Sequence, residues 1–456
     1  MTSDNSLSFD VEAALASTPQ VHSILRAMRS DKLKFWLVGG GARDILAGRK
    51  ITDLDLVTEL NPPLFLGKIG PGLGFSIFPL DVDRGFYRLT RKKPSPFTVD
   101  ILRMHGNSIE EDLARRDFTI NAMAIPLSTP LPSGSARSSI VDPFGGLGDL
   151  EKRILRPVTA HSLDDDPVRV LRAHRLALVM GLSCSQDMER MMAQAAGALG
   201  DVAAERILME LAKIMAHPQS HKTVAAMAHD GTLSAIFPEA KLEQTTMADK
   251  TLEAISRLDE ALRNTAQSPY LDEPVGAGIT RKEVVKIAAM LCYSRQEDGT
   301  ELKRLAYKAS RRLKAPSMAA KGVAAMAWGW RRAMVEPPDD GAVFDWMRVM
   351  GDWTEGALLL ARSYSSVQKQ AIVETFSSTV NRIAKQWIAA WPPGSPPITG
   401  QDIMATLDLA PGPEVGRLLA EAEKAAALGE ISGKDEALAY IKGKKPGFRG
   451  SAYLES

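Results

Sequence analysis

The chain has 456 residues, a formal net charge of +1 and two cysteines. This length is enough for several domains with packed cores, and the near-neutral charge excludes a broadly basic surface, so any nucleic acid must be held by local patches. Cys184 and Cys292 form no C-x-x-C motif, the acidic N-terminal stretch is not a signal peptide, and no apolar run reaches the roughly 18 residues of a membrane span. We therefore expect a reduced, cytoplasmic protein without a membrane partner.

The most informative stretch covers residues 35–58 and reads FWLVGGGARDILAGRKITDLDLVT. Its apolar start, residues 35–38, predicts a buried strand, and residues 42–47 predict the first turns of a helix. The three consecutive glycines between them suit a tight turn or a close approach to a ligand. Backbone N–H groups at such a helix start can bind phosphate oxygens, although strand-to-helix turns without a ligand also carry glycine.

A second strand is predicted at residues 51–57, where the alternation places Asp53 and Asp55 on one face and apolar residues on the other. Carboxylates roughly 6.5–7 Å apart on one strand face repel each other unless a cation lies between them. Hard oxygen ligands of this kind suit Mg²⁺. The alternative is a solvated acidic face on an edge strand, and the glycine turn directly upstream favours the magnesium site over it.

The segments LVGGGARDILAGR and TDLDLVT together resemble the head-domain signature of the class II tRNA nucleotidyltransferases and bacterial poly(A) polymerases. Those enzymes have the DNA polymerase β type of nucleotidyltransferase fold. The resemblance implies that Gly39, Gly40 and Arg43 receive a nucleoside triphosphate. It also implies that Asp53 and Asp55 hold one or two Mg²⁺ ions, which activate the 3′-hydroxyl of the primer and neutralise the triphosphate.

Further strands are predicted at residues 75–80, 85–91 and 97–102, which would complete a small mixed sheet. In the last of these strands Asp100 stands among apolar neighbours. Its carboxylate could complete the catalytic metal site with the two earlier aspartates, or it could have a structural role. The sequence leaves both possibilities open.

The next motif lies in residues 110–125, EEDLARRDFTINAMAI. On a helix, Asp117 and Asn121 would share a face and could hydrogen-bond a ribose or a base edge together. A surface capping cluster is the alternative. The string RRDFTINAMA resembles the sugar-binding motif of the same family, which implies that Arg116, Asp117 and Asn121 position the sugar.

A third motif, HSLDDDPVRVLRAHRLAL, covers residues 161–178. Pro167 suits the first position of a helix, which would make Asp166 its N-cap. Asp166, Arg169 and Arg172 also lie on one i, i+3 row, where a carboxylate acceptor and guanidinium donors can match the Watson–Crick edge of a base. Both interpretations stay open on the residues alone.

This third motif resembles the family's E-D-x-x-R motif, in which protein side chains replace a template and select CTP or ATP. The resemblance implies that Asp166 and Arg169 select the base, on a predicted helix that we call the selector helix. Asp165 stands where the family has glutamate, a departure that shortens this side chain. AAERILMEL, residues 203–211, resembles the family's Glu-Arg helix and implies that Glu205 and Arg206 support the selector helix.

From about residue 162 the pattern is helical almost to the end. The predicted fold class is α+β, with a polymerase-β-like nucleotidyltransferase head followed by an all-α neck, body and tail. A basic run in the body, LKRLAYKASRRLK, is either a solvated helix face or a contact for an RNA backbone. The predicted domains are a catalytic head at 1–160, a base-selecting neck at 161–240, a body at 241–390 and an RNA-binding tail at 391–456.

The resemblance implies a template-independent enzyme that extends the 3′ end of tRNA with cytidines from CTP and, in its full version, with adenosine from ATP. Three alternatives stay open: an enzyme that adds only CC, a poly(A) polymerase that uses ATP alone, and an inactive RNA-binding relative. The intact Asp53 and Asp55 argue against the inactive relative. The implied partners are the tRNA 3′ end and the nucleoside triphosphates, and no protein partner is indicated.

The connection between Asp100 and Arg115 is short. CCA-adding members of the family usually carry a longer flexible segment here, which is thought to help the selector helix reorient from CTP to ATP. Only about residues 104–108 could move freely in this chain, so it resembles the CC-adding members. The alternative is that the Ser/Pro-rich loop at residues 127–139 helps the selector helix reorient instead.

Overall fold

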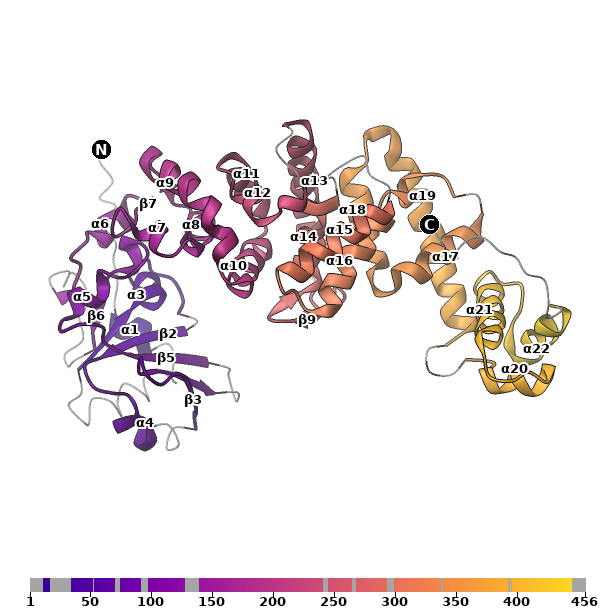
Figure 1. Cartoon of the computed structure of the whole chain (residues 1–456), viewed down its shortest axis with the longest axis horizontal. Coiled ribbons are helices and arrows are strands. Elements are labelled where there is room, and N and C mark those ends of the chain that lie inside the picture. Colours follow the sequence, from indigo (N-terminus) through magenta and orange to yellow (C-terminus); the bar gives the residue numbers. More distant parts are fainter. Residues whose placement is uncertain are drawn as a thin grey trace. The chain divides into compact units, whose positions relative to one another are not determined.

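The computed structural model of the chain forms two compact units (Figure 1). Unit 1 comprises Met1–Val202 and Asp230–Thr232, and unit 2 comprises Ala203–His229 and Leu233–Ser456. This division falls inside the predicted neck, and the four-domain organisation stays a prediction. The residues that the structure describes are 11–16, 34–51, 53–69, 74–91, 97–127, 139–240, 245–264, 268–292, 299–337, 339–392, 394 and 396–444.

Unit 1 contains a six-stranded mixed sheet within its described residues, in the order β3-β4-β5-β2-β1-β6. β2 and β5 run parallel, and the other neighbouring strands are antiparallel. This sheet and the helices that follow it confirm the predicted α+β class. The strands are β1 (Phe35–Val38), β2 (Asp53–Thr58), β3 (Ser76–Asp81), β4 (Phe86–Arg91), β5 (Phe97–Arg103) and β6 (Ala124–Pro126).

Short helices accompany this sheet, together with a small parallel pair of strands, β7 (Ile154–Leu155) and β8 (Ser183–Cys184). The helices are α1 (Val11–Ala16), α3 (Gly39–Leu46), α4 (Pro63–Ile69), α5 (Ile109–Leu113), η2 (Thr119–Asn121), α6 (Gly146–Glu151), α7 (Ser162–Asp165), α8 (Val168–Met180), α9 (Gln186–Ala196) and η4 (Gly197–Asp201).

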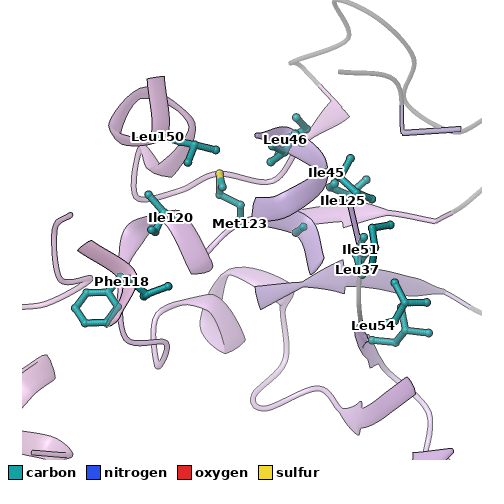
Figure 2. Close-up of a cluster of buried hydrophobic side chains, with 14 of the residues drawn as sticks. Leu37, Ile45, Leu46, Ile51, Leu54, Phe118, Ile120, Met123, Ile125 and Leu150 are labelled. Carbon is teal, nitrogen blue, oxygen red and sulfur yellow. The ribbon is translucent and has the colours of Figure 1, made fainter. Parts of the chain in front are cut away.

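The alternation in β2 separates an apolar face from an acidic one. Leu54 is buried in the main hydrophobic core of unit 1, together with Leu37 of β1 and Ile45 of α3 (Figure 2). Val57 is buried on the opposite face, in a smaller cluster that helix α5 covers. Asp55 shares this second face because side chains two apart on a strand point the same way. The predicted strand and its inward-facing leucines are therefore confirmed.

Unit 2 is built mainly from helices in its described part. Its helices are α10 (Ala204–Ala216), α11 (Ser220–His229), α12 (Thr232–Ile236, whose first residue belongs to unit 1), η5 (Pro238–Ala240), α13 (Thr245–Asn264), α14 (Arg281–Cys292), α15 (Gly299–Arg312), α16 (Ser317–Gly329), η6 (Arg332–Met334), α17 (Asp340–Met350), η7 (Gly351–Trp353), α18 (Thr354–Tyr364), α19 (Val367–Ala390), α20 (Gly400–Leu407), α21 (Pro413–Ala427) and α22 (Gly433–Gly443). Two short strands, β9 (Pro274–Gly276) and β10 (Ile279–Thr280), pair with each other.

The last helices have a hydrophobic core of their own. Buried residues of α20, α21 and α22, from Ile403 to Ile441, pack together with Ile398 just before them. The partly buried Trp391 packs against this cluster at its N-terminal edge. The cluster lies within the range predicted for the tail.

Unit 2 also buries a polar group that we call the Asp259 network, made by Ser220, His221, Asp259 and Lys286. The Lys286 Nζ lies 2.6 Å from Asp259 Oδ1, and neither side chain is more than 1% exposed. Lys286 also donates to the Ser220 hydroxyl and to the His217 carbonyl. Desolvation lowers the pKa of Lys286, although the charge of Asp259 opposes this shift. Every group of the network thus has a partner inside the fold.

Two expectations about the environment of the chain bear on its fold. None of the described helices is long and apolar enough to cross a membrane. Cys184 and Cys292 carry free thiols, and desolvation by burial raises the pKa of Cys184 to about 11. A thiol with so high a pKa stays protonated and unreactive near neutral pH.

Candidate active site

The candidate active site begins where strand β1 meets helix α3. The helix starts at Gly39, three residues earlier than predicted, so the glycine run forms its first turn. Gly39 has a φ of +64°, and a Cβ there would lie 2.9 Å from Asp55 Oδ2 and 3.2 Å from Arg116 Nη1. Only glycine therefore allows this backbone to lie against a carboxylate and a guanidinium at once.

The start of α3 has the properties of an anion site. Its N-cap residue, Val38, provides no side-chain hydrogen bond, and its first turn contains no acidic residue. The first N–H groups of a helix have no acceptor within the helix, and the helix dipole makes this end positive. Phosphate oxygens are the usual ligands of such an end. The triphosphate role predicted for Gly39 and Gly40 is compatible with this geometry and stays a prediction.

Arg43, the third residue predicted to bind triphosphate, is engaged within the fold. Its Nη1 donates to Asn121 Oδ1 at 2.9 Å, and its Nε and Nη2 bind Asp44 Oδ1 at 3.0 and 2.8 Å. Its side chain is 11% exposed. Arg43 thus joins the glycine turn to the sugar motif, and its contact with phosphate stays a prediction.

The sheet register brings two of the three predicted carboxylates together. Asp55 and Asp100 are direct partners across the parallel strands β2 and β5, so they lie on the same face. Asp100 accepts two hydrogen bonds of 2.7 Å each from Arg88 of β4. The backbone of Asp53 pairs with Thr98 in the same ladder, but the Asp53 side chain lies outside the described residues. The catalytic role of Asp100 therefore stays a prediction.

The donor chemistry at this position suits a hard divalent cation. The carboxylate of Asp55 lies against Gly39, where a Cβ would fill the space beside it. Among the side chains that the structure describes, there is no cluster of three or more potential metal ligands. Mg²⁺ commonly uses only one or two carboxylates and completes its shell with waters and substrate phosphates. The residues present therefore fit Mg²⁺ in the company of a triphosphate.

The sugar motif is not the α-helix that was predicted. Only Thr119–Asn121 forms a helical turn, of the 3-10 type, and Asp117 lies before it. The predicted i, i+4 helical geometry is therefore wrong, because the bridge between Phe118 and Pro157 holds the preceding backbone extended. Asp117 and Asn121 nevertheless meet, since Asn121 Nδ2 donates to Asp117 Oδ1 at 3.0 Å.

Asp117 connects the sugar motif to helix α8. Arg172 Nη1 donates to Asp117 Oδ2 at 2.9 Å, and the Asp117 side chain is only 6% exposed. Burial by itself would raise the pKa of Asp117. The charge of Arg172 and the hydrogen bonds from Asn121, Arg172 and the Phe118 N–H outweigh burial and lower this pKa. Asp117 is thus an ionised anchor at neutral pH.

The guanidinium of Arg116 has one buried N–H donor that a ligand could use. Its Nη2 pairs with Asp112 Oδ2 at 3.1 Å, and its Nη1 lies near Gly39. Its buried Nε has no hydrogen-bond partner among the described residues. A buried donor without a partner costs free energy, so an acceptor supplied by a ligand would bind favourably here. A sugar hydroxyl or a phosphate oxygen has this chemistry.

Helix α8 is the predicted selector helix. Its N-cap residue is Pro167 rather than Asp166, because the helix begins at Val168, and no side-chain hydrogen bond caps it. Asp166 instead follows the last residue of α7. Asp166 Oδ2 lies 4.0 Å from Arg169 Nε. Arg169 also donates to the carbonyls of Ser162 and Arg115. The structure thus places the two predicted selectors side by side, with Arg172 on the same helix turned to the sugar motif.

The two residues predicted to support the selector helix lie on α10, in unit 2. Glu205 Oε1 accepts a hydrogen bond of 2.6 Å from Lys314 Nζ, which is also in unit 2. This bond lowers the pKa of Glu205. Glu205 is therefore engaged by another partner, and the supporting role of Glu205 and Arg206 stays a prediction.

Two residues near the site were missed by the sequence analysis. Arg88 was missed because its pairing with Asp100 depends on strand register, although the alternation of β4 places it opposite the buried Tyr87 and Leu89. Ser162 was missed because it looks like an ordinary helix start. Its hydroxyl donates to the Asp117 carbonyl at 3.0 Å and lies 3.0 Å from Arg169 Nη1.

Comparison with known proteins agrees with this arrangement. The family described as the Poly A polymerase head domain matches residues 83–156, and the one described as the probable RNA and SrmB-binding site of polymerase A matches residues 181–243. A solved structure of a CCA-adding enzyme in an apo form has a TM-score of 0.69 and 19% identity, with 98% of this chain and 100% of that chain covered. At this identity the likeness concerns the fold.

Curated relatives match over nearly their whole length. The CC-adding tRNA nucleotidyltransferase of Synechocystis sp. is 28% identical over 410 residues, which cover 89% of this chain and 92% of the relative. The A-adding tRNA nucleotidyltransferase of Deinococcus radiodurans is 29% identical over 433 residues, covering 89% and 94%. With the glycine turn, the paired strands and the sugar motif in place, the chain belongs to the family of class II tRNA nucleotidyltransferases and bacterial poly(A) polymerases.

Proposed function

We propose that this chain is a template-independent nucleotidyltransferase that adds two cytidines from CTP to the 3′ end of tRNA and stops before the terminal adenosine. The names of its relatives support nucleotide addition to tRNA but include both CC-adding and A-adding enzymes. The choice among products therefore depends on the site itself. We further infer that the protein acts in the cytoplasm.

In this proposal each part of the site has one task. Asp53 and Asp55 hold Mg²⁺, which, when bound, neutralises the triphosphate and activates the primer hydroxyl. The start of α3 receives phosphate oxygens at Gly39 and Gly40, close to the guanidinium of Arg43. Asp100 stands beside Asp55 as a further catalytic carboxylate.

The remaining residues orient the nucleoside. Arg116 offers its Nε, which no described residue engages, while Asp117 and Asn121 present a preformed hydrogen-bonded pair to the sugar. Asp166 and Arg169 face the base as acceptor and donor. Arg172 fixes the distance between selector and sugar motif through its bond to Asp117. A template is not needed, because these side chains are held in place by the fold.

The observation that carries the CC-adding assignment is how residues 104–108 are held. The backbone N–H of His105 donates to Asp112 Oδ1 at 3.0 Å, and that of Asn107 donates to Glu111 Oε2 at 2.8 Å. Ser108 caps helix α5 by accepting from the Glu111 N–H. A segment so short and so tied to its own helix has little freedom to move the selector helix. This restraint supports a selector helix that stays in the orientation that selects CTP.

Full CCA addition is the second candidate. It would need another lever, and most of the loop at residues 127–139 lies outside the described residues. A poly(A) polymerase is the third, because a matching family is described by that activity.

Helix α15 offers a surface for the RNA backbone. Lys303 and Arg311 are exposed and have no carboxylate partner among the described residues, and the exposed Tyr307 lies between them along the helix. Arg312 and Lys314 are instead paired with Glu239 and Glu205. We infer that the first two cations are available to phosphates, whereas the last two hold the end of α15 to η5 and α10.

The product assay tests the proposal directly. Purified protein is incubated with Mg²⁺ and tRNA lacking its CCA end, tRNA ending in C, or tRNA ending in CC, with labelled CTP or ATP in turn. We expect two cytidines on the first substrate, one on the second, and no ATP incorporation on the third. Efficient conversion of tRNA-CC to tRNA-CCA would contradict CC-only addition, and addition of many adenosines to varied RNA ends would identify a poly(A) polymerase.

A further inference from the structure

The carboxylate of Asp100 carries its own counter-ion. Asp100 and Arg88 are direct partners across the antiparallel strands β4 and β5. Arg88 Nε and Nη2 each donate to a different oxygen of Asp100, both at 2.7 Å. The Asp100 side chain is 15% exposed and that of Arg88 is 43% exposed. Such a bidentate contact is strong and directional, and it occupies both oxygens of the carboxylate.

This pair is one end of a row of charges across the sheet. Arg88, Asp100 and Asp55 are successive partners on β4, β5 and β2, so all three lie on one face. Neighbouring strands are about 4.8 Å apart, a spacing at which two unpaired carboxylates repel each other. Beyond Asp55, the guanidinium of Arg116 lies near the same point above Gly39. An arginine thus stands at each end of the two carboxylates.

We propose that Arg88 is a positioning residue that withholds Asp100 from a bare divalent cation, so that the metal is bound firmly only together with a nucleoside triphosphate. This inference rests on the proposed function. A free cation would meet a neutralised Asp100, because Arg88 already cancels its charge and fills its coordination sites. A cation that arrives with a triphosphate brings phosphate oxygens as ligands, so its binding does not require Asp100, whose catalytic role belongs to the transfer step.

The Arg88–Asp100 pair couples the binding of the metal to the binding of the nucleotide. Without nucleotide, the cluster stays balanced by its own arginines and does not depend on a metal for its stability. With nucleotide, the negative triphosphate adds ligands and charge at the start of α3, close to Asp55. Metal and nucleotide therefore bind with positive coupling. Arg88 contributes to that coupling by weakening only the binding of the metal alone.

Binding of Mn²⁺ to the nucleotide-free full chain tests this proposal without any nucleotide transfer. Free Mn²⁺ is counted from its electron paramagnetic resonance signal during a titration at neutral pH and fixed ionic strength. We compare the unaltered chain with Arg88→Gln, Asp100→Asn and the double variant. Arg84→Gln is the matched control, because Arg84 lies in the turn between β3 and β4, is 86% exposed and pairs only with Asp81 in the described residues.

We expect Arg88→Gln to bind Mn²⁺ about tenfold more tightly than the unaltered chain, the size of effect that one adjacent charge has on the proton affinity of a carboxylate. Asp100→Asn leaves the charge of Arg88 uncompensated and should weaken the binding, whereas the double variant should return to the affinity of the unaltered chain. Arg84→Gln should behave as the unaltered chain does. Arg88→Lys keeps the charge but cannot make the bidentate contact, so its gain in Mn²⁺ affinity should be smaller. This variant replaces Arg88→Gln if Arg88→Gln does not fold.

Two results would overturn the proposal. If neither Arg88 variant binds Mn²⁺ more tightly than the unaltered chain, Arg88 does not withhold the carboxylate. If the double variant binds Mn²⁺ more weakly than the unaltered chain, Asp100 is already a metal ligand. The proposed function is tested separately, because its failure would appear as a lack of CTP incorporation by the unaltered chain, whatever the Mn²⁺ titrations show.

Discussion

The molecule contains two networks of charged side chains. They have similar residue types but differ in solvent exposure and in whether their donors find partners inside the fold. The Asp259 network of unit 2 is closed around its ion pair, with Asp259 0% and Lys286 1% exposed, while His221 at its edge is 24% exposed. The network at the candidate active site in unit 1 is open at its edges, since Arg88 is 43% and Arg172 is 34% exposed. The first network satisfies its own groups, while the second leaves the buried Nε of Arg116 without a partner among the described residues.

This difference separates a structural network from a binding site. A closed network gains its stability from internal pairing and would lose it if a ligand entered. A partly exposed network with an unsatisfied buried donor, which we call the open network, is completed only when a ligand supplies an acceptor. The residue types alone do not make the distinction, because aspartates and basic side chains occur in both. Each network therefore predicts a different response to removal of one charge.

The largest effect is expected from Asp55→Ala, at the open network. Nucleotide transfer should fall on the order of 10³-fold or more, as expected when a group that stabilises the charge of phosphoryl transfer is lost. Stability should hold or rise, because one of two neighbouring carboxylates is removed. CTP incorporation and thermal unfolding measure the two effects. Asp81→Ala, at a half-buried carboxylate of β3 that pairs with Arg84, is the control. Near-normal turnover by the Asp55 variant would remove the metal assignment.

The closed network should respond in the opposite way. Lys286→Met leaves Asp259 buried without its cation, which should cost about 3–5 kcal/mol of unfolding free energy. Turnover per folded molecule should be unchanged, because no residue of the site is touched. Urea unfolding followed by active-site titration measures both. Lys282→Met on the same helix is the control, since Lys282 is 32% exposed and pairs loosely with Asp272. A loss of turnover with full stability would show that this network takes part in function.

The sequence was informative wherever a pattern is local. The strand at 35–38, the alternation of Leu54 and Asp55 and the stretch of helices beyond residue 162 follow from spacing alone, and the structure confirms them. The start of α3 was misplaced, because a glycine run reads as a turn unless the helix hydrogen bonds around it are known. The turn after Asp117 was misread because a bridge to Pro157, distant in sequence, holds that backbone extended.

The candidate site was predictable only in part. The motifs named its residues, but the contacts among them cross long sequence separations. Arg43 binds Asn121, and Arg172 binds Asp117. Arg88 belongs to no recognised motif, and only the register of β4 against β5 brings it next to Asp100. Such pairings are set by tertiary packing, which a single sequence does not reveal.

An intermediate effect is expected within the open network at Arg169. Arg169→Ala should reduce the preference for CTP over ATP by about 1–3 kcal/mol, the discrimination lost with one two-pronged contact between an amino acid and a base. Triphosphate binding should weaken less, because the start of α3 is untouched. Competition between labelled CTP and ATP measures the preference. Arg190→Ala on the exposed face of α9 is the control, and unchanged selectivity would show that Arg169 only ties the backbone of residues 115 and 162 together.

A smaller effect is expected from acid on the open network. The pKa of Asp117 is lowered in the folded state below its ordinary value of 3.8. Ionised Asp117 therefore contributes stability above that value, and the contribution is lost as pH falls through the lowered folded pKa. Asp117→Asn should remove this part of the acid dependence and leave a flatter profile below pH 3.8. Unfolding by urea across the acid range measures it, and an unchanged slope would show that Asp117 is not coupled to stability through Arg172.

The smallest effect concerns the segment at residues 104–108, which borders the open network. Ser108→Ala removes the acceptor that caps the Glu111 N–H and should cost about 0.5–2 kcal/mol. Ser185→Ala, the corresponding cap of α9, is the matched control for stability. If product length is limited because the segment is too short, loosening it should leave the product at two cytidines. Incorporation of ATP by Ser108→Ala, and not by Ser185→Ala, would show that the cap, rather than the length, holds the site in its CTP form.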